Sequence, residues 1–269
     1  MTPGFLQRME RTRILVGDDG LQRLASAHVL VCGLGGVGSY AAEGLCRAGV
    51  GRLTLVDADG VSPSNINRQL HATVASVGQS KVALMGAHLE RINPDAQLDL
   101  QELFLDPRTT PELLDRISPH WVADCIDSLN CKVNLLVSAQ ARGLAVISSM
   151  GAGGRFDPTA VRVDDLMDTH GCPLAREVRN RGRRQGLQRG VLAVWSDEPP
   201  RPHRPPEPVS WGRPRAVNGT LGYLPALFGM TLAGTIVRRL LEGGQRRSDS
   251  TDRIEMPQLV EISSSPPSL

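Results

Sequence analysis

The chain has very little lysine and no closely spaced pair of cysteines. Only two of its 30 basic residues are lysines, Lys81 and Lys132, so the net charge of +2 arises almost entirely from arginines set against 28 acidic residues. The five cysteines form no Cys-x-x-Cys pair: Cys32, Cys46, Cys125, Cys131 and Cys172. This spacing argues against a disulfide framework and a four-cysteine zinc site, and it favours a reducing cytoplasm. All but Cys172 lie on apolar segments and are interpreted as core residues.

The sequence also shows no pattern typical of a secretory signal or of a clear membrane span. Residues 1–20 are charged and contain no apolar run. The longest apolar segment, 220–241, contains Pro225 and several glycines and ends in Arg238 and Arg239. These features predict a buried or interface helix rather than a span, so membrane association is not expected.

A glycine motif is the most informative feature that is present. Its members are Gly33, Gly35, Gly36 and Gly38. The motif follows the apolar residues 29–31, and such a turn from strand to helix lets backbone amides approach phosphate. The next apolar segment ends in Asp57, which is placed to accept hydrogen bonds from ribose hydroxyls. These features predict a Rossmann-like nucleotide-binding domain; the alternative is a structural turn with Asp57 as its cap.

Strand and helix patterns alternate along the first 150 residues. After an amphipathic helical element at 1–27, the expected elements are strand 29–33, helix 39–48, strand 52–57, helix 80–92, strand 97–101, helix 110–117, strand 121–126, helix 130–142 and strand 144–148. This alternation predicts an α/β fold with a doubly wound, mostly parallel sheet. The N-terminal helical element 1–27 and a C-terminal extension flank the main domain, which is expected to span 28–242.

The remainder of the chain has weaker patterns. A strand region is expected at 155–165, and the arginine-rich 166–190 is expected to be partly helical. Proline and arginine crowd 197–216, so an irregular, mobile segment is predicted within 166–216. The Ser/Pro-rich tail 243–269 is expected to be disordered apart from a short apolar patch near Leu259.

Polar residues follow the glycine motif in a pattern that indicates phosphate chemistry. The candidates for nucleotide binding are Asp59, Asn65, Asn67, Arg68, Gln69, Lys81, Asp127 and Ser128. The guanidinium of Arg68 suits phosphate oxygens, and Lys81 supplies a point charge at a helix start. Asp127 follows a strand at the edge where doubly wound folds bind ligands, and its carboxylate suits Mg²⁺. The pattern therefore predicts an ATP site with a magnesium ion.

Several other residues have two open interpretations. Asp59 either binds polar groups nearby or caps the following loop, and Asp124 is interpreted as shaping a turn rather than binding metal. His71 is either an acid or base for the substrate or a hydrogen-bonded structural histidine. Cys172 has arginine neighbours, which lower a thiol pKa, but its surroundings match a thioester motif poorly.

Six motifs in this order resemble the E1-like adenylating enzymes, the superfamily of ThiF, MoeB and the ubiquitin-activating enzymes. They are GLGGVG at 33–38, DAD at 57–59, NINRQ at 65–69, VGQSK at 77–81, INP at 92–94 and DCIDS at 124–128. Within this superfamily the chain is most similar to the tRNA threonylcarbamoyladenosine dehydratases. That similarity rests on NINRQLH at 65–71, GAGG at 151–154 followed by Asp157, and the lack of paired zinc cysteines.

The resemblance implies a reaction and a set of roles. The domain 28–242 would be a ThiF-type, ligase-like adenylating domain that uses ATP and Mg²⁺. It would activate the threonyl carboxylate of N6-threonylcarbamoyladenosine at position 37 of tRNA as an acyl-adenylate. The carbamoyl nitrogen would then attack this adenylate and close a five-membered hydantoin ring. Asp57 would bind the ribose, Arg68 and Lys81 the phosphates, and Asp127 the metal.

The resemblance also implies a homodimer. Arg11, in an Arg-x-x-Arg element with Arg8, would reach the ATP site of a partner subunit and complete a catalytic set with Arg68, Lys81 and Asp127. The alternative is that Arg8, Arg11 and Arg13 form the solvated face of a helix. Some relatives dock a cysteine desulfurase or sulfur acceptor, which is a further partner that the resemblance suggests.

A tRNA substrate would need a cationic surface. The arginines available for it are Arg176, Arg179, Arg181, Arg183, Arg184, Arg189, Arg201, Arg204, Arg213 and Arg215. The alternative is a solvated, compositionally biased loop.

Two other functions remain open on the sequence. An activator of a ubiquitin-like sulfur carrier in thiamine or molybdopterin synthesis would share the ATP site, but it usually has paired zinc cysteines. An NAD-dependent oxidoreductase would explain the glycine motif, but it would leave Arg68, Lys81 and Asp127 without a role.

Overall fold

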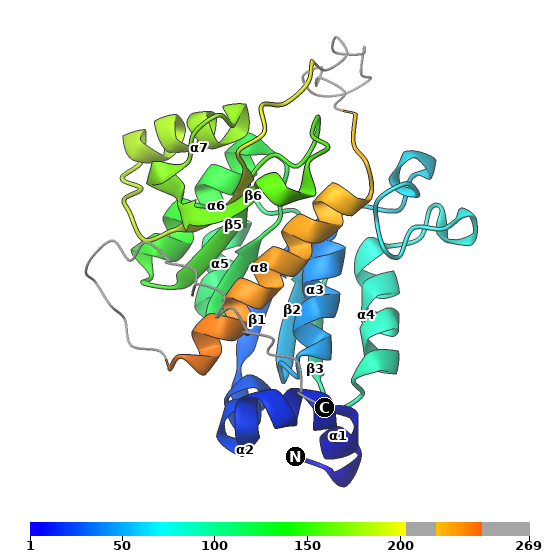
Figure 1. Ribbon diagram of the computed structural model, residues 1–269. Helices are drawn as coiled ribbons and strands as arrows, with labels where there is room; N and C mark the ends of the chain where they lie inside the picture. The colour runs from blue at the N-terminus through cyan, green and yellow to red at the C-terminus, as the bar shows by residue number, and fades with distance from the viewer. Residues whose placement is uncertain (203–218, 244–269) are drawn as a thin grey trace, which may run out of the picture.

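A seven-stranded sheet forms the centre of the protein, as the computed structural model of residues 1–202 and 219–243 shows (Figure 1). The strand order is β3-β2-β1-β4-β5-β7-β6. All neighbouring strands are parallel except β6 and β7, which pair antiparallel. The predicted α/β fold with a doubly wound, mostly parallel sheet is therefore confirmed.

The elements expected up to residue 149 all occur, with small shifts at their ends. The strands are β1 (His28–Cys32), β2 (Arg52–Val56), β3 (Gln97–Gln101), β4 (Trp121–Asp124), β5 (Ala145–Ser149), β6 (Val161–Asp165) and β7 (Leu192–Ser196). The α-helices are α1 (Pro3–Arg8), α2 (Glu10–Ser26), α3 (Gly38–Arg47), α4 (Lys81–Ile92), α5 (Thr109–Ile117), α6 (Leu129–Ala141), α7 (Pro173–Arg184) and α8 (Tyr223–Leu241). Short 3₁₀ helices are η1 (Pro63–Asn65), η2 (Val74–Ser76), η3 (Pro158–Ala160) and η4 (Leu166–Asp168).

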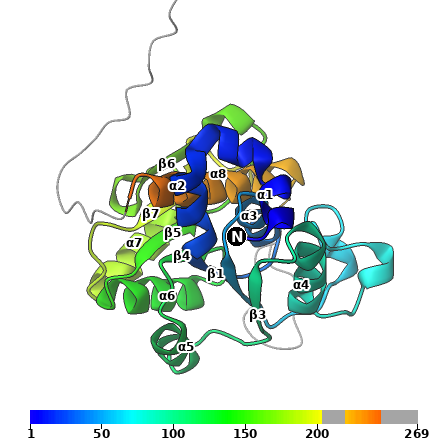
Figure 2. The ribbon, with the colours of Figure 1, turned by 90° about the horizontal axis from the view of Figure 1, so that it is seen from below.

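Two buried clusters cover the two faces of the sheet. Successive residues of a strand point to opposite faces, so Val29 and Val31 of β1 pack in one cluster with α3, α4 and α8. Leu30 and Cys32 pack in the other with α5, α6 and α7. Figure 2 shows these two helical layers on either side of the strands. The continuous burial of β1 is typical of a parallel strand covered on both faces.

Helix α8 is a core helix whose position depends on small residues. By length and composition it is the one helix in the described residues that could cross a membrane. However, Phe228, Leu232 and Ile236 are fully buried. A Cβ on Gly229 would lie 2.3 Å from the carbonyl oxygen of Val37, so only glycine permits this approach to α3. This packing agrees with the expected buried helix.

The N-terminal helical element lies at the amino end of the strands (Figures 1 and 2). Helix α2 bends at Gly17, which has φ +72°. Phe5, Met9 and Leu21 form a small buried cluster between α1 and α2. The helices expected at 1–27 therefore occur, and they pack against the main domain: a Cβ on Gly20 would lie 3.1 Å from Leu241, and Arg23 donates to the Leu241 carbonyl at 2.6 Å.

The region 166–202 is more regular than the expected mobile segment, although its helix α7 agrees with the partly helical structure expected at 166–190. It contains η4, α7 and β7, and β7 lies between β5 and β6 in the sheet. Ala193, Val194 and Trp195 of β7 are buried on both faces, which explains why this short apolar run becomes a strand. The remaining part of the expected mobile segment lies outside the described residues, as do Arg204, Arg213, Arg215 and the tail 244–269 with Leu259.

Candidate active site

The glycine motif forms a tight turn at the carboxyl end of β1. The amide of Gly33 donates to the carbonyl of Val56 at 2.8 Å, and Gly33 has φ +86°, a conformation that favours glycine. A Cβ on Gly38 would lie 1.7 Å from the carbonyl oxygen of Gly33, so α3 can begin here only with glycine. A Cβ on Gly35 would meet only the Gln69 amide nitrogen, at 3.8 Å, so the backbone is open on that side. This geometry suits a phosphate at the start of α3.

Asp57 holds this turn in place. Its Oδ2 accepts a hydrogen bond from the Leu34 amide at 2.6 Å, and its Oδ1 accepts one from the Asp59 amide at 2.9 Å. Burial raises the pKa of Asp57, and the hydrogen bond from Leu34 and the charge of Lys81 oppose that rise. The structural cap considered from the sequence is therefore present. Ribose binding by the same carboxylate stays a prediction.

Lys81 is a buried cation at the first residue of α4. Its side chain is 7% exposed, and its Nζ lies 2.9 Å from Asp59 Oδ2 and 3.9 Å from Asp57 Oδ1. The carboxylate of Asp59 is 72% exposed. Asp59 therefore binds a polar group, as one of its two interpretations proposed, and the structure places Lys81 beside the glycine turn.

Arg68 lies against the glycine turn at Gly36. A Cβ on Gly36 would be 3.2 Å from Arg68 Cγ. The guanidinium donates to the Ser64 carbonyl at 2.7 Å and to Asn67 Oδ1 at 2.9 Å. Asn67 in turn donates to the Thr220 carbonyl at 3.0 Å, which ties this loop to the segment before α8. Asn67 therefore positions Arg68 and α8 in this structure.

Asn65 and Gln69 differ in what their side chains contact. Asn65 Oδ1 accepts the Ser62 amide at 3.0 Å in the capping box of η1, so its oxygen has a structural partner. Gln69 is 7% exposed, and its Oε1 has no hydrogen-bond partner in the described residues. A buried acceptor without a partner is costly, so Gln69 is suited to a ligand or water beside the glycine turn.

The loop after β4 completes the site. A Cβ on Gly33 would lie 3.0 Å from the Cys125 carbonyl, so this loop packs directly on the glycine turn. Asp124 Oδ1 accepts the Ile126 amide at 3.1 Å, which agrees with its interpretation as a residue that shapes the turn. Asp127 is exposed, and Ser128 is the N-cap residue of α6.

No group of three or more His, Cys, Asp or Glu side chains that could hold a metal occurs in the described residues. A magnesium ion usually takes one or two carboxylates together with substrate phosphates and water. The exposed carboxylate of Asp127 fits that donor set beside the glycine turn.

A second buried lysine escaped the sequence interpretation. Lys132 Nζ lies 2.6 Å from Asp124 Oδ2 and also donates to Ser148 Oγ at 3.1 Å and to the Ser149 carbonyl at 2.9 Å. Ser148 Oγ donates to the same Asp124 oxygen at 2.5 Å. The scarcity of lysine, and an aspartate at the end of the preceding strand, were the signals that could have found this pair.

The ring nitrogens of His71 and the whole of Cys172 are buried. Both ring nitrogens of His71 are buried without a hydrogen-bond partner in the described residues, so the hydrogen-bonded structural histidine is not what the structure has. Burial, with the charges of Lys81 and His88, lowers the pKa of His71 to about 4. Cys172 is 3% exposed and belongs to a core cluster. A thioester would require this thiol to be reachable.

The other cysteines agree with their interpretation as core residues to different degrees. Cys32 and Cys46 are buried, and Cys125 and Cys131 are half-buried. Burial raises the pKa of Cys46 to about 11 and raises the pKa values of Cys32 and Cys125 further. The thiols of Cys32, Cys46 and Cys125 are therefore protonated and unreactive at neutral pH.

Arg11 is not brought to the site of its own chain. It is exposed on α2, at the opposite end of the strands from the glycine turn (Figure 1). Arg8 forms an ion pair with Asp95, and Arg13 forms one with Asp18. Arg11 forms none within the described residues, so only a second molecule could bring it to an ATP site.

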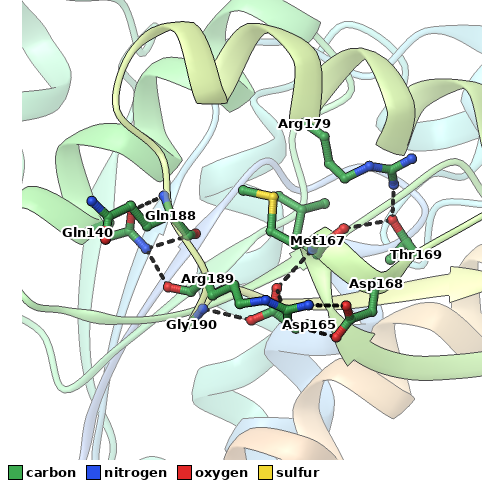
Figure 3. Close-up of polar contacts among 10 residues, drawn as sticks. Gln140, Asp165, Met167, Asp168, Thr169, Arg179, Gln188, Arg189 and Gly190 are labelled. Carbon is green, nitrogen blue, oxygen red and sulfur yellow. Dashed lines mark hydrogen bonds and ion pairs between the residues drawn. The ribbon is translucent and has the colours of Figure 1, made fainter. Parts of the chain in front are cut away.

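The arginines proposed for a nucleic-acid surface divide into two groups. Figure 3 shows that Arg189 pairs with Asp168 and that Arg179 donates to Thr169, so both are held by neighbours within the chain. Burial, with the charges of Arg183 and Arg176, lowers the pKa of Arg179. Arg181 donates to Asn130 Oδ1 at 2.7 Å. Three further arginines of α7 are exposed and take part in none of these hydrogen bonds: Arg176, Arg183 and Arg184.

The fold and the site define a Rossmann-like α/β protein with a glycine turn, two cations and carboxylates arranged for a nucleotide. The ThiF family model matches residues 9–260. The chain belongs to the ThiF family.

Two relatives match nearly the whole chain. The tRNA threonylcarbamoyladenosine dehydratase of Bacillus subtilis is 36% identical over 245 residues, which cover 88% of this chain and 96% of the relative. The crystal structure of the Escherichia coli tRNA N6-threonylcarbamoyladenosine dehydratase in complex with ATP is similar with a TM-score of 0.80 at 31% identity. That match covers 90% of this chain and 96% of the solved chain.

A third relative matches over a shorter region. The molybdopterin-synthase adenylyltransferase of Escherichia coli is 39% identical over 153 residues, which cover 56% of this chain and 59% of that protein. The local identity is therefore high in both groups of relatives, and the two differ mainly in how much of the chain is matched.

Proposed function

We propose that the protein catalyses the ATP-dependent dehydration of N6-threonylcarbamoyladenosine at position 37 of tRNA to the cyclic hydantoin form. The observation that carries this proposal is the similarity to the Bacillus subtilis dehydratase over 88% of this chain and 96% of the relative. The molybdopterin-synthase adenylyltransferase matches only 56% of the chain. The similarity beyond the nucleotide-binding part therefore favours the dehydratase.

The geometry suits adenylation of a carboxylate. The threonyl carboxylate attacks the α-phosphate of ATP, and pyrophosphate leaves. Such a reaction requires positioned cations rather than a nucleophile from the protein. Arg68 and Lys81 flank the glycine turn and supply positive charge where the phosphates would lie. Asp127 would hold Mg²⁺, which when bound neutralises phosphate charge.

Ring closure needs no protein nucleophile. The carbamoyl nitrogen of the substrate attacks the activated carbonyl carbon and forms a carbon–nitrogen bond. The bond from that carbon to the phosphate oxygen breaks, and AMP leaves with its electron pair. The proton of the nitrogen passes to a base or to water. The burial of Cys172 supports this route, because a thioester enzyme would need an accessible thiol.

We further propose a homodimer in which Arg11 enters the ATP site of the partner subunit. Arg11 is exposed, and the neighbouring Ile14 and Leu15 are 72% and 86% exposed. Exposed apolar side chains beside a cation are suited to an interface between subunits. A tRNA substrate also implies a location in the cytoplasm, where tRNA is available. A sulfur-transfer protein is an additional candidate partner.

For tRNA phosphates we propose the exposed arginines of α7. Arg176, Arg183 and Arg184 lie on one helix at the upper left of Figure 1. Phosphate contacts of this kind position RNA and weaken as salt rises. Arg179 and Arg189 are excluded from this set by their hydrogen bonds within the chain, whereas Arg176 has a longer ion pair of 3.9 Å with Glu177.

The proposed function is tested by reconstitution. Purified protein, ATP, Mg²⁺ and tRNA that carries N6-threonylcarbamoyladenosine should yield a position-37 nucleoside lighter by one water, measured by mass spectrometry after digestion. The variant Cys172→Ala should form as much product as the wild type. An unchanged nucleoside, with the protein instead consuming ATP on a carrier protein that ends in two glycines, would favour the alternative.

That alternative is adenylation of a ubiquitin-like sulfur carrier in thiamine or molybdopterin biosynthesis. The 39% identity to the molybdopterin-synthase adenylyltransferase favours it as the second candidate.

The same reconstitution also tests the dimer: a mixture of Arg11→Ala and Lys81→Ala chains should recover part of the activity that each lacks alone. No recovery after confirmed exchange of subunits would contradict a role for Arg11 across the dimer.

A further inference from the structure

An exposed aromatic side chain next to the candidate active site is held in a fixed position. Phe156, between β5 and β6, is 45% exposed. Its amide donates to Glu198 Oε2 at 2.8 Å, and its carbonyl accepts the hydroxyl of Tyr223 at 2.7 Å. Both partners come from distant parts of the chain. The backbone of Phe156 is therefore anchored on both sides, although much of its ring faces solvent.

A cation lies over this ring. The guanidinium carbon of Arg201 is 4.1 Å from the centroid of Phe156. The Arg201 amide donates to the carbonyl of Gly154 at 2.7 Å, and the Gly154 amide donates to the carbonyl of Gly219 at 2.8 Å. Arg201 is exposed, so the pair presents planar, partly cationic groups to solvent. Phe156, Arg201 and Tyr223 are called the stacking platform below.

The stacking platform is connected to the glycine turn through the first turn of α8. Tyr223 begins α8, and Pro225 of the same turn of helix lies 3.0 Å from the position of a Cβ on Gly36. The segment just before Tyr223 accepts the hydrogen bond from Asn67, the neighbour of Arg68. A ligand held by Arg68 and the glycine turn would therefore lie next to the helix turn that anchors the platform through Tyr223.

We propose that the stacking platform binds an unpaired nucleobase of the RNA substrate, next to the nucleoside that enters the active site. This inference rests on the proposed function. Proteins recognise single-stranded RNA loops by stacking splayed bases on aromatic rings and arginine planes. The flexible, ring-free tail of a carrier protein would gain little from such a surface. The exposed, anchored planes of Phe156 and Arg201 thus favour RNA.

The test measures binding of an anticodon stem-loop RNA that carries N6-threonylcarbamoyladenosine at position 37. Phe156→Ala should raise the Kd for this RNA about 5- to 150-fold, the range that corresponds to one base stacked on an aromatic ring. Phe156→Leu keeps an apolar contact without a ring and should weaken binding to a similar degree, whereas Phe156→Trp should retain it. The Kd for ATP should not change in any of these variants.

Arg201 has a matched control. Arg91, in the last turn of α4, is exposed at the opposite edge of the sheet. Arg201→Ala should weaken RNA binding more than Arg91→Ala, which removes the same charge. Arg201→Lys keeps the charge but loses the plane, so it should also weaken binding.

The outcomes separate this inference from the proposed function. If the wild type forms the cyclic nucleoside but Phe156→Ala and Phe156→Leu bind RNA like the wild type, the stacking platform is wrong and the function stands. Equal losses in Arg201→Ala and Arg91→Ala would also overturn the platform, because general electrostatics would explain them. If the wild type forms no cyclic nucleoside and the Phe156 variants weaken binding of a carrier protein instead, both the function and the RNA platform are wrong.

Discussion

The only two lysines of the chain contrast in their surroundings, although both are buried and both pair with aspartate. In the centre of the molecule, the side chains of Lys132 and Asp124 are 0% exposed and 2.6 Å apart. At the candidate active site, Lys81 is 7% exposed, but its partner Asp59 is 72% exposed. One ion pair is closed off from water, and the other has one side in water.

The contrast separates a structural cation from one that is available to a ligand. A lysine ammonium has three donors, and at Lys132 an aspartate, a hydroxyl and a carbonyl accept all three. A ligand could reach Lys132 only by breaking these bonds. The carboxylate of Asp59 can turn into solvent at little cost, so Lys81 can exchange this partner for a phosphate.

The largest expected effect on stability comes from breaking the ion pair of Lys132 and Asp124. Lys132→Met keeps the buried stem but leaves Asp124 as an unpaired buried charge, so it should lower the free energy of unfolding by about 3–5 kcal/mol. Lys81→Met is the matched control and should lower it by about 1 kcal/mol, because Asp59 regains water and Asp57 keeps its two backbone hydrogen bonds. Denaturant unfolding followed by circular dichroism measures both values. Equal losses in the two variants would contradict the division between the pairs.

A smaller effect is expected on the titration of His71. Its pKa is lowered to about 4, first by burial and then by Lys81 and His88. Lys81→Met removes one of these charges, so the pKa of His71 should rise, whereas Lys132→Met should leave it unchanged. Imidazole NMR signals followed against pH measure this shift. His28 is an internal control, since its pKa of about 4 has causes that do not include Lys81.

The same lowered pKa makes a prediction about stability. Because the folded protein binds the proton of His71 less readily than the unfolded chain, the contribution is complete above the ordinary pKa of 6.5 and is lost as pH falls through about 4. The melting temperature should therefore fall over this interval. A smaller fall in His71→Gln than in the wild type would support the assignment, and an identical fall would contradict it.

The nucleotide-binding half of the fold was predictable because its signals are local. The glycine motif lies between an apolar strand and a helix, and Asp57 ends the next strand, so spacing alone placed these elements. Strand β7 was missed because it is a short apolar run between arginine-rich and proline-rich segments. A fully buried strand of this kind has no alternating pattern to reveal it.

The candidate site was predictable where it depends on one segment and not where it depends on distant contacts. Arg68 and Lys81 belong to motifs close to Asp57, and the structure brings them to the glycine turn. Lys132 and Tyr223 have roles that arise only when strands and helices from separate parts of the chain meet. The position of Arg11 relative to an ATP site depends on a second subunit, which one chain cannot specify.

We expect Lys81, and not Lys132, to act on ATP. Exchange of radiolabelled pyrophosphate into ATP, dependent on tRNA with N6-threonylcarbamoyladenosine, measures this difference between the two lysines. Measured where both variants are folded, Lys132→Met should retain exchange, and Lys81→Met should lose about 100- to 1,000-fold, as expected when a donor that stabilises developing charge is removed. Exchange by Lys81→Met at the wild-type rate would contradict the account.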